Sequence, residues 1–213
     1  MRQIRITLFI MLLIVVTQPM QAQFSVGILG DLSSSNISGD APSKTKYSGR
    51  TGFGHGIIVD YKVTDEITLS IQPMYLPKGT TISYDLPSYE KERDSVDAKF
   101  KYITIPLMIK VNATKVVYVT SGFDVGFLQS ATATMINVDG EQDITDKIQS
   151  MDISVNFGVG FTFQVSSFNL FFEGRYSQGL YNVSNFPDKN ENNISSDFKN
   201  TGTQLLFGAL YNF

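Results

Sequence analysis

The sequence predicts an all-β fold: an eight-stranded antiparallel transmembrane β-barrel with short turns at one end and long loops at the other. Apolar residues alternate with small or polar ones along most of the chain, and an amphipathic helix cannot produce that period of two. Connections alternate between tight turns and long polar stretches, as in membrane barrels. The last residues, 204–213, keep the strand pattern and end on Phe213, whereas a soluble domain commonly frays at its end.

The N-terminal segment, residues 1–22, has the layout of a secretory signal peptide. Arg2 and Arg5 precede an apolar run over 6–16, and Ala22 is a small residue suited to cleavage. The alternative, a membrane-spanning helix, needs about 20 apolar residues, and this run is too short. The mature chain is therefore predicted to be a single domain, residues 23–213, exported through the inner membrane.

The composition of the mature chain narrows the classes of function. Loss of the signal peptide removes two arginines, so 15 basic and 20 acidic side chains remain and the net charge changes from -3 to -5. Nucleic-acid binding favours a basic face, so nucleic acid is not an expected partner. The chain has no cysteine, and disulfides therefore cannot stabilise it outside the cytoplasm.

The clearest strand is predicted over residues 153–165. Every odd position there is apolar and every even position is small or polar. The run is longer than the about five or six residues of a typical globular strand. We expect the odd positions to face lipid: Ile153, Val155, Phe157, Val159, Phe161 and Phe163.

The other strands repeat the pattern less strictly, and their polar face is rich in glycine. Small groups suit the crowded interior of an eight-stranded barrel, while bulky apolar side chains suit surrounding lipid. The alternative is a soluble secreted barrel of the lipocalin type, with its polar face in water. In chain order, the strands are predicted over about 24–34, 51–63, 67–84, 100–111, 115–135, 168–183 and 204–213.

Two kinds of connection join these strands. Their alternation predicts that the short turns face the periplasm and the long loops face outward, with both ends of the mature chain on the periplasmic side. The tight turns are predicted at 63–66, 112–115 and 165–168, and the long polar loops at 35–50, 85–98, 136–148 and 182–199.

The final strand explains the aromatic chain end. In lipid every backbone polar group must be satisfied, so the last strand has to pair with the first and close the sheet. Tyr211 and Phe213 are then expected at the periplasmic interface, where aromatic girdles lie.

The signal peptide and the terminal aromatic-x-aromatic strand resemble those of bacterial outer-membrane barrels, in which that ending is the assembly signal. More specifically, "KYITIPLMIK" (101–110) and "FFEGRYSQGLYNVS" (171–184) resemble the PorT-like or porin-family outer-membrane β-barrel domain of Gram-negative bacteria. The resemblance implies an outer-membrane location, an assembly signal at Tyr211 and Phe213, and the barrel assembly machinery as a partner. Many members of the family have no assigned activity.

Several charged residues fall on the small, polar face and are predicted to point into the lumen. Glu173 and Arg175 lie two positions apart on one strand face. An unpaired buried ion costs several kcal/mol, so we predict a paired network that plugs the barrel rather than an ion or proton path. The predicted lumen residues are Asp31, Asp60, Lys62, Lys110, Asp124, Glu173 and Arg175.

The sequence offers little catalytic chemistry. The single histidine, His55, falls on the outward face, which makes a Ser-His-Asp site a remote alternative. One histidine and no cysteine argue against a transition-metal site. The acidic stretch 139–146 lacks the glutamate that ends a calcium-binding loop. We therefore expect neither an enzyme nor a cofactor.

These observations favour a structural or surface-interaction protein of the outer membrane, with a plugged lumen and long loops that meet an extracellular ligand. Two alternatives remain open: a small-solute porin or transporter, and an accessory component of a secretion apparatus.

Overall fold

The computed structural model describes residues 23–39, 45–85, 93–135, 140–184 and 198–213 of the 213-residue chain. The predicted signal peptide, residues 1–22, lies outside these ranges.

The described chain is almost entirely β-structure, with strands of up to 20 residues. In chain order the elements are β1 (Phe24–Ser38), β2 (Thr45–Lys62), β3 (Ile67–Ile71), β4 (Met74–Asp85), β5 (Arg93–Asn112), β6 (Val117–Met135), β7 (Glu141–Asp143), the 3-10 helix η1 (Thr145–Lys147), β8 (Met151–Val165), β9 (Phe168–Gly179) and β10 (Lys199–Asn212).

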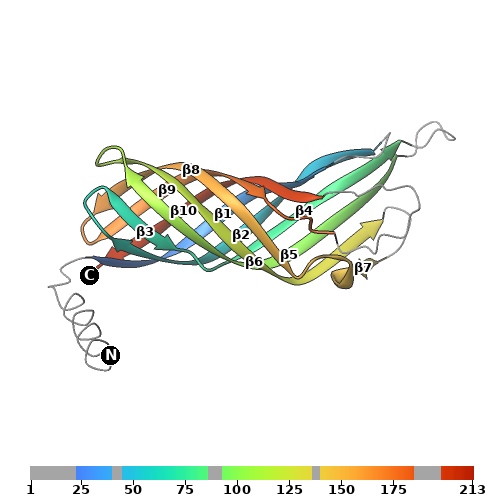
Figure 1. Cartoon of the computed structure of the whole chain (residues 1–213), viewed down its shortest axis with the longest axis horizontal. Coiled ribbons are helices and arrows are strands. Elements are labelled where there is room, and N and C mark those ends of the chain that lie inside the picture. The colour runs from blue at the N-terminus through green and yellow to red at the C-terminus, as the bar shows by residue number, and fades with distance from the viewer. Residues whose placement is uncertain (1–22, 40–44, 86–92, 136–139, 185–197) are drawn as a thin grey trace, which may run out of the picture.

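The antiparallel strands close into a ring (Figure 1). β3 and β4 together occupy one position in the wall, because both pair with β2 and with β5. The short β7 pairs with β6 at the edge of the ring. β1 pairs with β10 from Ser25 opposite Asn212 to Ser38 opposite Lys199, so the first and last strands satisfy each other's backbone. The predicted ring of eight strands is confirmed.

The wall has one interruption, between β3 and β4. Gln72 and Pro73 separate these strands, and Pro106 lies beside them on β5. Gln72 still donates its N–H to the Pro106 carbonyl (3.0 Å), and Ile57 donates to the Pro73 carbonyl (3.0 Å). The proline rings remove two ladder donors, so the strand is divided here without opening the sheet.

The two ends of the barrel differ, and we call them the turn end and the loop end. The turn end carries the short connections 63–66, 113–116 and 166–167 together with Phe24 and Asn212. The loop end carries β7 and the longer connections (Figure 1).

The strands extend further toward the loop end than the sequence predicts. The described parts of the expected loops 35–50 and 85–98 are almost all strand, because β1 continues to Ser38, β2 begins at Thr45 and β5 begins at Arg93. The alternation of apolar residues stops before these strands end. Backbone pairing continues beyond that point through serine and threonine residues, as between β1 and β10. Conversely, β9 ends at Gly179, before the predicted limit of 183.

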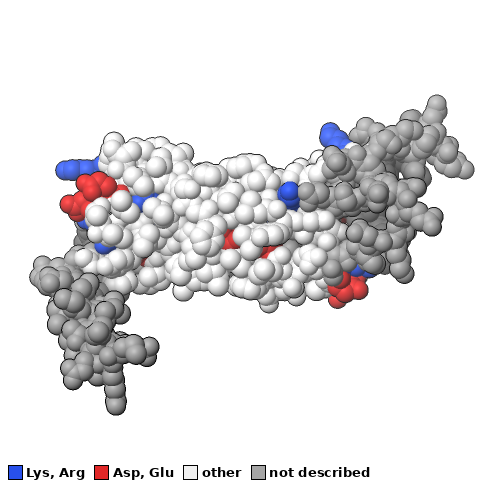
Figure 2. All heavy atoms as spheres, viewed as in Figure 1, with Lys and Arg blue, Asp and Glu red and all other residues white. Residues whose placement is uncertain are grey.

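The outer surface is an apolar band. All six predicted lipid-facing residues of β8 point outward, and Phe157 is 56% exposed. On the face seen in Figure 2, charged side chains gather at the two ends of the barrel and are sparse between them. This distribution suits a hydrocarbon layer around the middle of the wall. Among the described residues, no helix is both long and apolar enough to span a membrane.

Candidate functional site

The candidate site is the lumen, and its centre is organised by Arg175 of β9. The guanidinium group contacts Glu173 through Nη2 (2.6 Å) and Nε (2.7 Å). It also donates to the Gln72 side chain across the barrel (2.9 Å). Glu173 accepts a further hydrogen bond from Thr120 on β6 (3.1 Å). These bonds join three wall positions, so the pair ties the strands together as well as filling the lumen.

Toward the turn end, Lys110 of β5 pairs with Asp60 of β2 at 2.7 Å. The Lys110 ammonium group also lies 5.6 Å from the ring centre of Tyr118 and 5.5 Å from that of Phe171. The ring of Tyr118 fits because Gly160 has no side chain; a Cβ there would stand 2.3 Å from the ring. The cation therefore has both a carboxylate and two aromatic faces around it.

Toward the loop end, Lys78 of β4 pairs with Asp152 of β8 at 2.9 Å. Asn200 of β10 donates to the same carboxylate oxygen at 2.8 Å. The Lys78 ammonium group lies 5.3 Å from the ring centre of Tyr102. The side chains of the ion pair are 7% and 0% exposed, so this pair is enclosed.

Two lumen carboxylates have no such pairing. Both oxygens of Asp31 and the Oδ1 atom of Asp124 are buried without a hydrogen-bond partner among the described residues. The Arg175 charge and the Ser33 hydroxyl lie near the Asp31 carboxyl group, and Asp124 lies close enough to Lys78 for their charges to attract. The buried charged residues in the described chain comprise five acids and three bases, so the lumen carries excess carboxylate.

Of the predicted lumen residues, the structure joins Asp60 to Lys110 and Glu173 to Arg175, as separate pairs. Asp31 and Asp124 are buried in the interior outside these pairs, and Lys62 differs from all of them. Lys62 is not in the interior: its side chain is 48% exposed and pairs with Asp65 at 2.7 Å in the turn after β2. That hydrogen bond and the Lys62 charge hold the pKa of Asp65 below its usual value. Lys62 lies at the mouth of the barrel, where water and a neighbouring turn replace interior partners.

Sequence reasoning missed Lys78 and Asp152. Asp152 precedes the predicted strand 153–165 but shares the phase of its inward positions, and Lys78 follows the interruption at Pro73. Extending the alternation by one residue would have found Asp152, and Lys78 already lay within the predicted strand 67–84, on the even positions of its polar face.

An apolar cluster lies inside the barrel near the loop end. Its wall residues pack against Ile148, which follows η1. Ile148 bridges to Ser184, and the N–H of Gln149 donates to the Val183 carbonyl (2.8 Å). The segment after η1 therefore continues the pairing of β8 with β9 beyond the ends of these strands. The buried cluster comprises Ile37, Ala98, Phe100, Tyr102, Ala131 and Ile148.

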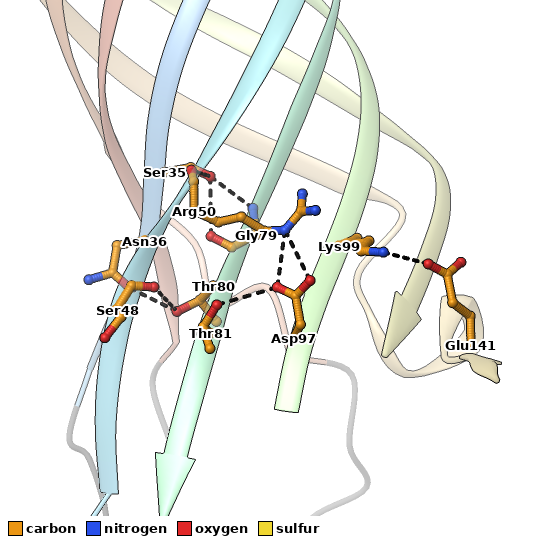
Figure 3. Close-up of polar contacts among 10 residues, drawn as sticks. All are labelled: Ser35, Asn36, Ser48, Arg50, Gly79, Thr80, Thr81, Asp97, Lys99 and Glu141. Carbon is orange, nitrogen blue, oxygen red and sulfur yellow. Dashed lines mark hydrogen bonds and ion pairs between the residues drawn. The ribbon is translucent and has the colours of Figure 1, made fainter. Parts of the chain in front are cut away.

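The outer rim of the loop end is polar (Figure 3). Arg50 of β2 reaches past β4 to Asp97 of β5 at 3.0 Å, and Thr81 of β4 donates to the same carboxylate at 3.3 Å. Where β2 and β4 lose their regular register, the Ser35 hydroxyl bonds the N–H (2.9 Å) and carbonyl (3.1 Å) of Gly79.

β7 is attached to the same rim by charge. Lys99 contacts Glu141 at 2.5 Å (Figure 3), and this hydrogen bond, with the lysine charge, holds the pKa of Glu141 below its usual value. Within the acidic stretch 139–146, for which the sequence argued against calcium binding, residues 141–143 form β7 at the barrel edge. In the part of the chain that the structure describes, no cluster of three or more metal-ligating side chains occurs.

His55 is exposed on the outer surface, between the rings of Phe53 (6.4 Å) and Tyr75 (5.5 Å). This aromatic environment provides none of the partners of a catalytic histidine.

A family model described as "Outer membrane protein beta-barrel domain" matches residues 18–185 of the chain. None of the curated proteins compared with the chain matches it. Among solved structures, the chain is similar to Ail of Yersinia pestis (15% identity, 91% of this chain and 100% of that chain covered, TM-score 0.46). It is also similar to Neisserial surface protein A (15%, 90% and 98%, 0.46) and to E. coli outer membrane protein W (14%, 92% and 100%, 0.43).

Proposed function

Since the chain belongs to the outer membrane protein beta-barrel domain family, we propose that it acts as a structural or surface-interaction protein with a plugged lumen. The family places the barrel in the outer membrane, and the soluble lipocalin-like alternative is wrong. The observation that carries the proposal is the Arg175 cluster, which consists of Arg175, Glu173, Gln72 and Thr120. Arg175 and Glu173 are 3% and 1% exposed at the centre of the lumen.

Two further features support a closed barrel. The apolar cluster around Ile148 covers the loop end, and the Lys78–Asp152 pair beneath it is enclosed. An eight-stranded barrel has an interior just wide enough for its own side chains. A small-solute porin or transporter needs a continuous aqueous path, so it is the second candidate.

Conductance separates these candidates. In planar bilayers the plugged barrel gives no stable single-channel step, because side chains occupy the lumen. Steady single-channel currents from the unaltered protein overturn the proposal and favour the porin or transporter. Arg175→Ala serves as the comparison: opening of a conductance only in this variant identifies the Arg175 cluster as the plug.

A surface role requires the loop end to face outward, and the absence of cysteine allows a direct test. Gln142→Cys, in the exposed β7, is expected to react with a membrane-impermeant maleimide on intact cells. The matched variant Thr114→Cys, in a turn at the opposite end, is expected to react only after the outer membrane is permeabilised. The reverse pattern excludes an extracellular ligand at the loop end.

We also propose that Tyr211 and Phe213 are recognised by the barrel assembly machinery. Their rings lie 5.2 Å apart, and Tyr211 also contacts Phe168 at 5.4 Å. Phe213 is 70% exposed at the turn end, so it is accessible to a partner. Phe213→Ala is expected to lower the amount of folded protein in outer membranes while leaving refolding of the purified chain into detergent unchanged; equal loss in both assays contradicts this role.

The finer assignment to PorT-like barrels remains our proposal and rests on the segments 101–110 and 171–184, while a place in a secretion apparatus remains an alternative. The signal peptide over residues 1–22 is a separate proposal, which rests on Arg2, Arg5 and the apolar run that follows them. N-terminal sequencing of the protein from outer membranes tests the cleavage after Ala22.

A further inference from the structure

The outer wall of the barrel carries an apolar hollow in the turn half, with a volume of about 550 Å³. It lies across β2, β3, β5 and β6, and the exposed side chains of Leu69, Ile109 and Phe123 belong to its rim. None of the described residues that line it is charged. One edge reaches Tyr61, whose ring centre lies 4.9 Å from that of Phe24 at the turn end. We call this feature the outer hollow.

The outer hollow reaches the backbone of the wall. Ser70 and Met108 line it although their side chains point inward and are 4% and 2% exposed, so they contribute main-chain atoms. The Ser70 hydroxyl accepts a hydrogen bond from Gln72 in the interior (2.9 Å) and therefore does not face the outer hollow. Gly122 of β6 adds backbone without a side chain. The floor is thus the sheet itself.

Ser121 of β6 explains why bulk is missing here. It points outward between Ile109 of β5 and Phe157 of β8, which are its partners across the two ladders. The neighbouring outward residues of its own strand, Val119 and Phe123, are large and apolar. One small side chain in a field of large ones leaves the gap. A gap that nothing fills loses the dispersion contacts of its lining, so an occupant is favoured.

The surroundings determine which occupant fits. The outer hollow opens on the apolar outer surface of an outer-membrane barrel, where hydrocarbon lies. A charged or strongly polar ligand would have no partner there and would lose its hydration. Lipid chains are as apolar as leucine, so no hydrophobic driving force brings a second copy to this face. Protein contacts in membranes rely on small residues that allow close approach, whereas this rim consists of bulky ones.

We propose that the outer hollow binds one acyl chain of a membrane phospholipid, from the leaflet that surrounds the turn end. Aromatic residues of membrane barrels lie at the membrane–water interface, so the Tyr61 edge receives the headgroup side while the chain runs toward Phe123. Ligand sites commonly have volumes of about 300–1,000 Å³, and the outer hollow falls within that range. The proposal goes beyond the structural role, because a plugged barrel needs no particular lipid on its wall.

The test uses the full barrel in detergent micelles, where the amount of phospholipid is controlled. A phospholipid with a nitroxide on its acyl chain is titrated, and broadening of methyl signals is followed by NMR. Broadening at Ile71, Leu107 and Ile109 is expected to saturate at a single lipid per protein. Leu170 and Leu205 are exposed on β9 and β10, across the ring, and are expected to broaden in proportion to total lipid. Equal, non-saturating broadening of both sets overturns the proposal.

Two variants sharpen this test. Ser121→Phe places a ring in the outer hollow and is expected to weaken the saturable binding at least about tenfold. Val159→Phe adds bulk to the exposed face of β8, outside the lining, and is the matched control that leaves binding unchanged. Equal weakening by both variants, or by neither, overturns the proposal.

A second copy of the chain is the competing occupant. Methyl shifts at Ile71, Leu107 and Ile109 that follow protein concentration without added lipid identify that occupant and overturn the proposal. All these outcomes are independent of the conductance measurement, so this proposal and the plugged lumen fail separately.

Discussion

Each half of the lumen holds a lysine that pairs with an aspartate and lies over a tyrosine ring, but the two halves are closed differently. The loop-half unit lies beneath an apolar cluster. The turn-half unit lines a polar cavity of about 400 Å³ at the turn end, the vestibule. The members are Lys78, Asp152 and Tyr102 in the loop half and Lys110, Asp60 and Tyr118 in the turn half.

The difference shows that the surroundings of an ion pair determine what the pair does. An enclosed pair cannot be replaced by water, so losing one partner strands a buried charge. A pair at the floor of an open cavity can be hydrated when a partner is lost. The same three residue types therefore lie in two settings, one enclosed and one beside a cavity that water can enter.

The largest expected effect lies between the two halves, at Arg175. Arg175→Ala leaves the buried Glu173 carboxylate without its cation and is expected to lower the free energy of unfolding by about 3–5 kcal/mol. The double variant with Glu173→Ala is expected to cost less than the sum of the single variants, because neither charge is stranded. Urea unfolding in liposomes gives these values. Additive losses mean that the two side chains are not coupled.

The comparison itself is tested by removing each lysine. Lys78→Met strands Asp152 in an enclosed site, and we expect a loss of about 3 kcal/mol. Lys110→Met leaves Asp60 beside the vestibule, where water can solvate it, and we expect about 1–2 kcal/mol. The free energies of unfolding are compared under identical detergent conditions. Equal losses mean that enclosure does not distinguish the two halves.

The outer wall provides a second contrast between the middle of the barrel and its loop end. Phe157→Arg or Phe161→Arg places a cation in the lipid band and is expected to cost about 2–4 kcal/mol of stability in liposomes. Gln129→Arg, on the exposed outer surface toward the loop end of β6, is the matched control and is expected to have little effect. No loss at the two phenylalanine positions would falsify the lipid-facing assignment.

Packing in the turn half is tested with two glycines. Gly160→Ala places a Cβ against the ring of Tyr118 and is expected to cost about 1–3 kcal/mol, the range for overpacking. Gly174→Ala, on the neighbouring strand, has no atom within 4 Å of the added Cβ and is expected to be nearly neutral. Thermal unfolding compares the two variants. A similar fall of the unfolding temperature in both variants means that the contact between the added Cβ and the Tyr118 ring does not cause the loss.

The smallest effect is at the mouth of the turn end. The pKa of Asp65 is lowered by its hydrogen bond with Lys62 and by that charge, so the stabilising contribution exists above the usual aspartate pKa and is lost as the pH falls through the lowered value. Lys62→Gln is expected to return the pKa of Asp65 to its usual range. An NMR titration of the carboxylate measures this; an unchanged pKa means that the exposed pair has no influence.

The unequal success of the sequence predictions has a physical origin. Phe157 and the other odd positions of β8 are more exposed than most of the positions between them, as the period of two predicts, because successive side chains of a strand point to opposite faces. The same alternation predicted Lys62 in the lumen, but alternation does not tell how far along the barrel axis a residue lies, and Lys62 lies at the mouth. The extension of β1 to Ser38 was missed because the residues beyond the lipid band no longer alternate in hydrophobicity.

The sequence by itself determined the antiparallel ring, its apolar outer surface and the inward position of Glu173 and Arg175, because side-chain alternation and backbone pairing act locally along each strand. Only the tertiary structure decided that Arg175 meets Gln72, that Lys78 meets Asp152, and that a polar cavity lies near one mouth while an apolar cluster lies near the other. Those contacts cross the lumen between strands far apart in the chain. They depend on the relative register of all the strands in the closed ring, and no single strand encodes it.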